Sequence, residues 1–304
     1  MSIVSEKIEI TGIVGELYYQ KNSKHNPTII LLRGGGPGNM EQYVSFSHDC
    51  VKAGYTVIRM ELEKHKQYAE CFLKNFNEYY NPSNWIFAFI SRMTVFELTC
   101  AYCKAVRATY DNFSSHSAID NQKMSVVGFS LGAQVALKYA RKNSFVKAMV
   151  SIMALPDWKP AFDKALQNVL SLKSKCTAAE IEQFLKDPKA SETLSACSNL
   201  LSPYIRDGLN FEGLLQDFTK YVARVSNENP INGIEGYASN PLLLISGAED
   251  LPDVLQFNQN LFEKLSPLYL QHKENLKIEI ENTKHLLTSN SLSQAINFLN
   301  KQFQ

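Results

Sequence analysis

The sequence predicts an α/β protein: a mostly parallel central sheet of about eight strands with helices on both faces, and a helical insertion. Three observations predict this. Short apolar runs without alternation recur along the chain, as in strands that are buried on both faces of a parallel sheet. Helical patterns separate most of these runs. One long stretch, residues 156–232, contains no good strand.

Eight segments are expected to be strands, and the first two should form a hairpin because Thr11 and Gly12 between them are a tight turn signal. The expected strands are residues 3–10, 13–19, 28–32, 55–60, 124–128, 146–152, 241–246 and 276–281. The expected helices of the core are residues 40–53, 95–110, 131–142, 254–265 and 286–303. This alternation of strand and helix favours a sheet that is covered on both sides.

The stretch at residues 156–232 breaks the alternation. It holds only amphipathic helical pieces, at residues 159–172, 178–185 and 211–225, and its borders lie near Pro156 and Pro230. We therefore expect a core domain made of residues 1–155 and 233–304, with residues 156–232 as a helical lid or cap above the sheet.

Composition excludes several classes of protein. The 304 residues carry 31 basic and 30 acidic side chains, for a net charge of +1, which favours neither a nucleic acid nor an anionic membrane as partner. Residues 1–10 include Glu6, Lys7 and Glu9, so no apolar signal segment is seen, and no apolar run is long enough to span a bilayer. We expect a soluble, cytoplasmic protein without stable membrane insertion.

Six cysteines do not make a disulfide framework in a chain of this length. Cys100 and Cys103 spell C-x-x-C, but they lie inside a periodic helical run, where two cysteines three apart are typical of core packing. No second pair of cysteines or histidines supports zinc. The sequence therefore predicts no metal and no cofactor.

The most informative motif is Gly128-Phe129-Ser130-Leu131-Gly132, a G-x-S-x-G pattern between a strand-like and a helix-like run. A serine hydroxyl is a poor nucleophile, so catalysis needs it exposed, rigid and next to a base. A sharp strand-to-helix turn supplies the first two and should strain the backbone of Ser130. Gly128 and Gly132 suit such a turn because strand and helix nearly touch there. The alternative is a glycine-rich turn with an ordinary serine.

An acid and a histidine should follow this serine, each in a loop after a strand. Asp250 follows the strand at residues 241–246 and is the candidate acid, with Glu249 and Asp253 near enough to compete. Of six histidines only His285 lies between the last strand and the last helix, so it is the candidate base; His272 is its only alternative.

Acyl transfer also needs backbone N–H groups that stabilise an oxyanion. One donor should be Leu131, directly after the serine. The other should come from the glycine-rich loop after the third expected strand, at residues 34–38, where Gly35 is the candidate and Gly36 could serve instead. A phosphate-binding loop is not supported, since no G-K-[ST] follows.

With these four signals in this order, the chain resembles the α/β-hydrolase superfamily over most of residues 1–155 and 240–303. The resemblance implies a serine hydrolase whose helical insertion is the family's variable lid. Residues 119–124 are similar to the dienelactone-hydrolase and prolyl-oligopeptidase-like branch, whereas residues 34–38 resemble the H-G-G-P-G loop of proline iminopeptidases, so the branch is open. The chain departs from these patterns at Arg33, where many members have His, at residues 61–65, and at Lys284.

The leading hypothesis is hydrolysis of a small-molecule carboxylic ester or thioester through an acyl-Ser130 intermediate, with Asp250, His285 and the N–H groups of Gly35 and Leu131. An aminopeptidase or an acyltransferase could use the same triad; an aminopeptidase would need lid carboxylates such as Glu180, Glu182 and Glu212. A hypothesis of another class is a non-catalytic protein of this fold that binds a ligand or a partner.

Overall fold

The computed structural model describes most of the core and part of the insertion. The described residues are 2–35, 40–63, 65, 85–141, 146–155, 157–160, 163, 166, 167, 170, 171, 177, 179, 211–237, 240–251 and 253–303.

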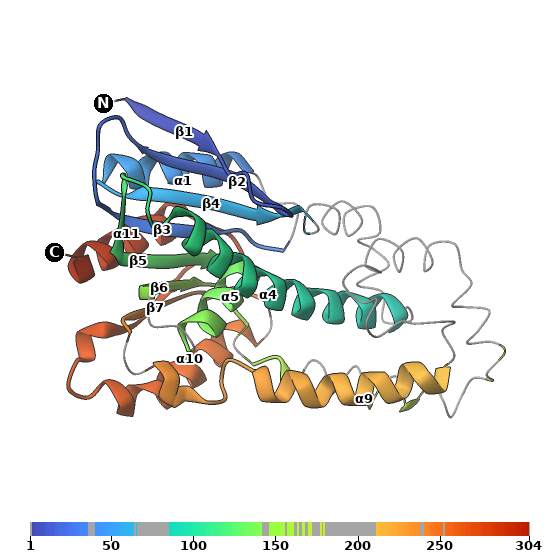
Figure 1. Ribbon diagram of the computed structural model, residues 1–304. Coiled ribbons are helices and arrows are strands. Elements are labelled where there is room, and N and C mark those ends of the chain that lie inside the picture. Colours follow the sequence, from blue (N-terminus) through green and yellow to red (C-terminus); the bar gives the residue numbers. More distant parts are fainter. Residues whose placement is uncertain are drawn as a thin grey trace.

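Eight strands form one sheet, as the sequence predicts (Figure 1). Their order across the sheet is β1-β2-β4-β3-β5-β6-β7-β8. β2 runs antiparallel to its neighbours β1 and β4, which confirms the expected hairpin, and every other neighbouring pair is parallel. The strands are β1 (Ile3–Lys7), β2 (Ile13–Gln20), β3 (Asn26–Leu32), β4 (Thr56–Leu62), β5 (Ile119–Phe129), β6 (Val146–Ile152), β7 (Leu242–Gly247) and β8 (Leu276–Glu281).

The strand order places two loops side by side. The chain leaves β3 towards β4 on one side, whereas it leaves β5 towards β6 on the other, although β3 and β5 are neighbours. In parallel sheets, ligands bind at such a switch point, at the carboxyl ends of the strands. The glycine-rich loop after β3 and the turn after β5 therefore meet at the same edge.

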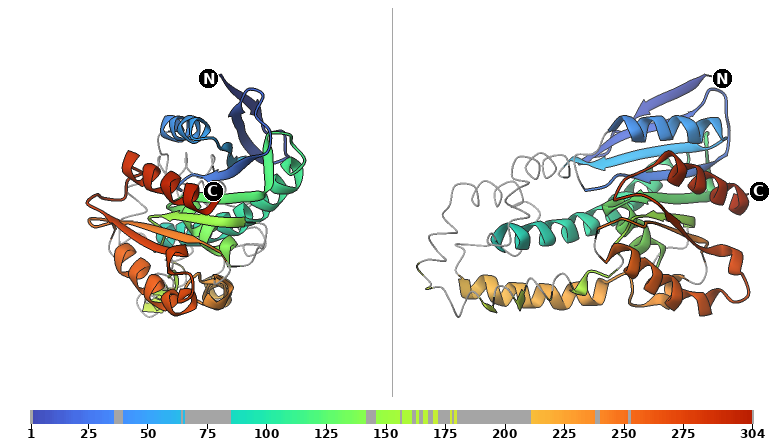
Figure 2. Two further views of the ribbon diagram at one scale, coloured as in Figure 1. Left: turned by 90° about the vertical axis from the view of Figure 1, so that its left-hand side faces the viewer. Right: turned by 180° about the vertical axis from the view of Figure 1, so that it is seen from behind.

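Helices cover both faces of the sheet. α1 (Met40–Lys52) and α11 (Ser289–Phe303) lie on one face, and α4 (Trp85–Phe113), α5 (Leu131–Ala140) and α10 (Val254–Leu265) on the other (Figures 1 and 2). Because side chains alternate along a strand, β3 contributes Leu31 to the core under α1 and α11, and Ile30 and Leu32 to the core under α4 and α5.

Short 3-10 helices complete the described part of the chain. They are η1 (Ile234–Tyr237), η2 (Ser266–Tyr269) and η3 (Lys273–Asn275).

Two helices begin at residues other than those expected. α4 begins at Trp85 rather than at residue 95; residues 85–90 are all apolar in the sequence, so they show no amphipathic stripe that would predict a surface helix. α11 begins at Ser289 rather than at Leu286 because the hydroxyl of Thr288 accepts the N–H of Ser291 at 3.0 Å and so caps the helix. The capped start leaves His285 in a longer loop.

Within residues 156–232, where the sequence predicts an insertion, the structure describes the helix α9 (Phe211–Glu228), close to the expected 211–225. The amino-terminal parts of α9 and α4 project beyond the sheet on the same side (Figures 1 and 2). Apart from residue 179, the expected helical piece at residues 178–185 lies outside the described residues. The lid role of the insertion stays a prediction.

Candidate active site

Ser130 occupies a sharp turn between β5 and α5, with φ +52° and ψ −110°. Two backbone hydrogen bonds hold this turn: Ser130 N–H donates to Ile152 O at 2.8 Å, and Gly132 N–H donates to Arg33 O at 3.0 Å. A residue other than glycine rarely adopts a positive φ, so the surrounding packing must hold the backbone of Ser130 in this conformation. The strained turn expected from the G-x-S-x-G pattern is present in the structure.

The side chains of Asp250, His285 and Ser130 form one chain of hydrogen bonds. His285 Nδ1 lies 2.7 Å from Asp250 Oδ1, and His285 Nε2 lies 2.9 Å from Ser130 Oγ. A carboxylate only accepts, so Nδ1 carries the proton and Nε2 is free to accept the hydroxyl proton of Ser130. The Asp250 side chain is fully buried, and that of His285 is one quarter exposed. This order of groups is the one that activates a serine.

The loops that carry Asp250 and His285 are tied to each other. Ala248 N–H donates to Glu281 O at 2.7 Å, and Glu249 N–H donates to Thr283 O at 3.0 Å. A Cβ on Gly247 would lie 2.5 Å from Thr283 O, so the two backbones approach as closely as they can. Backbone hydrogen bonds and close packing therefore join the loop after β7 to the loop after β8.

The buried carboxylate of Glu281 anchors the base of the His285 loop. Its oxygens accept hydrogen bonds from Thr288 Oγ1 at 2.8 Å, Ser291 Oγ at 2.8 Å and Asn290 Nδ2 at 2.9 Å. These donors lie at the start of α11, where the helix dipole also favours a negative charge. Glu281 thus connects the end of β8 to α11 across the loop that holds His285.

The competing candidates lie outside this chain of hydrogen bonds. Glu249 is exposed, and Asp253 is an exposed residue at the start of α10 with φ +76°. His272 is exposed and lies 3.6 Å from Glu274. Among the described residues only Asp250 contacts His285 through a carboxylate, so the structure distinguishes three acids that the sequence could not.

Gly35 and Leu131, the expected oxyanion donors, are neighbours. A Cβ on Gly35 would lie 3.5 Å from Leu131 Cβ. Within the described part of the chain, neither the N–H of Gly35 nor that of Leu131 donates to a protein acceptor. Both are therefore available to a bound oxygen. Gly36, the alternative donor, lies outside the described residues.

Arg33, where the sequence departs from the family pattern, forms a buried ion pair. Its NH1 atom lies 2.6 Å from Glu61 Oε1, and both side chains are about nine-tenths buried. Glu61 and His65 received no role from the sequence. Both approach the glycine-rich loop after β3 because β4 lies beside β3 in the sheet, which the sequence alone does not show.

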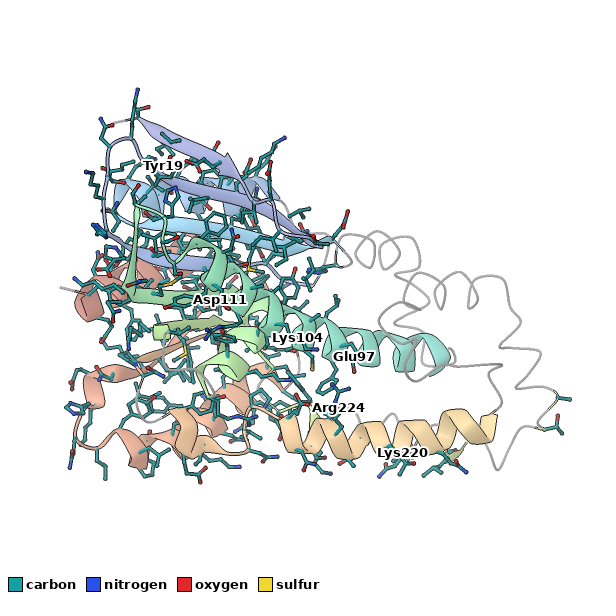
Figure 3. All side chains as sticks on the ribbon, viewed as in Figure 1. Tyr19, Glu97, Lys104, Asp111, Lys220 and Arg224 are labelled. Carbon is teal, nitrogen blue, oxygen red and sulfur yellow. The ribbon has the colours of Figure 1, made fainter. Side chains whose placement is uncertain are left out.

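Ion pairs connect α4, α5 and α9. Arg224 NH1 of α9 lies 2.6 Å from Glu97 Oε1 of α4 (Figure 3). Lys138 of α5 pairs with Glu228 of α9. Cys100, at mid-helix as expected, has its Sγ 3.1 Å from Lys138 Nζ. Burial nonetheless raises the pKa of the Cys100 thiol, so this cysteine is not activated as a nucleophile.

Two further features concern metal binding and membrane-spanning helices. Among the described residues, no three His, Cys, Asp or Glu side chains gather closely enough to hold a metal ion. In the same part of the chain, none of the helices is long and apolar enough to cross a bilayer.

A family model described as alpha/beta hydrolase fold matches residues 97–288 of the chain. This range contains Ser130, Asp250 and His285. No curated protein matches the chain in sequence.

Solved structures share the fold along nearly the whole chain. The Thermus thermophilus protein TT1662 has a TM-score of 0.56 at 14% identity, covering 99% of this chain and 98% of that one. The Pyrococcus furiosus esterase Pf2001 has a TM-score of 0.53 at 13% identity, covering 99% and 94%. S-formylglutathione hydrolase from Staphylococcus aureus has a TM-score of 0.52 at 12% identity, covering 98% and 96%. At such identities the likeness shows the fold alone.

Proposed function

Because this chain belongs to the α/β-hydrolase fold family, we propose that it is a serine hydrolase that cleaves small carboxylic esters or thioesters through an acyl-Ser130 intermediate. The observation that carries the proposal is the hydrogen-bonded chain from Asp250 through His285 to Ser130, whose last member sits in a strained turn at the switch point of the sheet.

Acylation follows from the proton positions. Ser130 Oγ attacks the carbonyl carbon while its proton passes to His285 Nε2, and Asp250 stabilises the imidazolium that forms. The carbonyl oxygen becomes an oxyanion, which the N–H groups of Gly35 and Leu131 stabilise. When the tetrahedral intermediate collapses, the alcohol or thiol leaves with the proton from His285, and the acyl group stays on Ser130.

Deacylation repeats these steps with water. His285 takes a proton from the water that attacks the acyl-Ser130 carbonyl, and returns it to Ser130 as the carboxylic acid leaves. The net reaction is ester or thioester plus water to carboxylic acid plus alcohol or thiol, and apart from substrate and water each step uses only groups of this chain. Residues 156–232 would act as the lid that selects the acyl group.

The test is covalent labelling. Wild type and Ser130→Ala are treated with a fluorophosphonate and measured by intact mass, with Ser293→Ala, a change at an exposed serine of α11, as matched control. We expect one adduct on wild type and on Ser293→Ala, and none on Ser130→Ala. A wild type that stays unlabelled and hydrolyses no ester would overturn the proposal in favour of a non-catalytic binding protein.

Substrate class is tested on the same proteins. Hydrolysis rates are compared for p-nitrophenyl esters of rising chain length, the corresponding acyl thioesters, and amino-acid p-nitroanilides. We expect turnover of esters or thioesters and loss of about 10⁴-fold or more in kcat for Ser130→Ala. Preference for the anilides would indicate an aminopeptidase instead.

A further inference from the structure

The peptide unit that carries the Gly35 N–H lies between two anchored peptide units. On one side, Arg33 O accepts the N–H of Gly132 at 3.0 Å, and Gly34 N–H donates to the hydroxyl of Tyr43 at 3.1 Å. On the other side, Gly35 O lies 3.2 Å from His65 Nε2. Glycine rotates easily about its backbone bonds, so the orientation of the intervening peptide depends on these anchors.

His65 makes the one side-chain contact to Gly35 O among the described residues. The histidine is fully buried, and it lies three residues after the end of β4 and 30 residues after Gly35. Because a carbonyl oxygen only accepts, Nε2 must carry the ring proton for this contact to be a hydrogen bond. The role of His65 therefore depends on which of its two tautomers is present.

Tyr102 of α4 selects that tautomer. Its hydroxyl oxygen accepts the N–H of Leu62 at 3.2 Å and lies 2.5 Å from His65 Nδ1. In the part of the chain that the structure describes, Nδ1 is the one acceptor within hydrogen-bond distance of this buried hydroxyl, so the hydroxyl proton is satisfied only if it points to Nδ1. Nδ1 then accepts, and Nε2 carries the ring proton and donates. The two rings meet edge to face, with centroids 5.5 Å apart, which fixes the plane of the imidazole.

The environment also keeps this imidazole uncharged. Burial, together with the positive charge of Arg33, lowers the pKa of His65 to about 4. At neutral pH the ring therefore has one donor and one acceptor, which match Gly35 O and the Tyr102 hydroxyl.

We infer that His65 is a positioning residue for the oxyanion site: its Nε2–H holds Gly35 O and so fixes the neighbouring peptide with its N–H available to the oxyanion. Tyr102 acts through His65. This inference rests on the proposed function, because it assigns the support of an oxyanion that only acyl transfer creates. The Arg33 and Tyr43 contacts hold the other end of the same loop.

The experiment compares four variants in the full chain. His65→Met removes the donor at similar volume, His65→Gln keeps an N–H donor within reach of Gly35 O, and Tyr102→Phe removes the hydroxyl that selects the tautomer. Tyr269→Phe is the matched control, since its buried hydroxyl lies 2.6 Å from Tyr237 O and 2.7 Å from Asn240 O at another part of the core. Each is measured for kcat and KM on a p-nitrophenyl ester, for phosphonylation by a fluorophosphonate, and for thermal unfolding.

Loss of one oxyanion donor costs about 10²–10³-fold in kcat, so a loosened donor should cost less. We expect His65→Met to lower kcat and the phosphonylation rate about 10–100-fold with KM within about twofold of wild type. His65→Gln should recover most of this loss, Tyr102→Phe should lose about 5–20-fold, and Tyr269→Phe should keep wild-type kcat while unfolding at a lower temperature.

Two results overturn the inference in distinguishable ways. If wild type is labelled and active while folded His65→Met keeps kcat within twofold of Tyr269→Phe, His65 only packs in the core, and the proposed function stands. If wild type is neither labelled nor active, the proposed function falls and the positioning role with it. Should His65→Met fail to fold, Tyr102→Phe decides by the same twofold criterion.

Discussion

A Cβ atom on Gly128 would lie 2.1 Å from the carbonyl oxygen of Gly132, so β5 and α5 leave room for a hydrogen atom only. Gly132 is limited in the same way, because a Cβ there would lie 2.4 Å from Leu32 O on β3. These contacts hold the turn in which Ser130 keeps its positive φ. The turn at Ser130 is thus supported by backbone on both sides.

Gly128→Ala should therefore destabilise the protein by about 3 kcal/mol or more, because neither backbone can retreat without breaking the sheet. Gly35→Ala is the matched change, since its Cβ would meet Leu131 at an ordinary 3.5 Å. We expect the control to change the free energy of unfolding by less than about 1 kcal/mol. Urea unfolding followed by circular dichroism measures both. Equal stability of the two variants would contradict this account of the turn.

Asp250→Asn should lower kcat by about 10³–10⁴-fold with little change in stability, because an amide in place of the carboxylate favours the wrong tautomer of His285. Glu249→Gln, at the exposed neighbouring position, should leave kcat within about twofold of wild type. Steady-state hydrolysis of a p-nitrophenyl ester measures the difference. A larger loss for Glu249→Gln would move the acid role to Glu249.

Glu281→Gln should cost about 1–3 kcal/mol of stability, since the new amide turns one acceptor into a donor facing the donors of Thr288, Asn290 and Ser291. It should also lower kcat, because the loop with His285 spans the two sides of this contact. Glu279→Gln, exposed on the same strand, is the control. The free energy of unfolding and kcat are measured for both variants. If Glu281→Gln changes neither, the His285 loop keeps its conformation without these hydrogen bonds.

The pH dependence of stability should contain a term from His65. Its pKa is about 4 in the folded protein against 6.5 for the free side chain, so between these values the unfolded chain binds the extra proton. Stability is then fully present above about pH 6.5 and falls as the pH decreases towards 4, by about 2 kcal/mol at pH 5. His65→Met lacks this term. Urea unfolding at pH 7 and pH 5 gives the change in the free energy of unfolding between the two pH values for wild type and for His65→Met. An equal change in both proteins would show that His65 binds its proton as readily in the folded as in the unfolded state.

Glu228→Gln should destabilise the junction of α5 and α9 by about 2–4 kcal/mol, since the Lys138 side chain is only 7% exposed and would lose its carboxylate partner. The exposed pair of Lys159 and Asp163 offers the contrast: Asp163→Asn should change stability by less than about 0.5 kcal/mol. Thermal unfolding at low and high salt separates the two. A Glu228→Gln protein as stable as wild type would mean that water hydrogen-bonds the Lys138 ammonium group in place of the carboxylate.

The fold class and the position of the Ser130 turn were readable in the sequence because both rest on local patterns. Unalternating apolar runs indicate strands buried on two faces, and Gly128 is required by a contact with Gly132, four residues away. Gly132 belongs to the same local motif, although the backbone that limits it is Leu32 of β3. The start of α4 was not predicted, because residues 85–90 are all apolar and so show no amphipathic pattern of a surface helix.

Which residues from distant parts of the chain contact each other was decided only by the tertiary structure. The sequence favours Asp250 as the acid but leaves Glu249 and Asp253 as competitors. Among these three, the structure places only Asp250 at hydrogen-bond distance from His285, which is 35 residues away. Arg33 and Glu61, like His65 and Gly35, meet because β3 and β4 are parallel neighbours. A sequence determines which residues can form a local turn, whereas long-range contacts depend on strand order and burial, which only the folded chain provides.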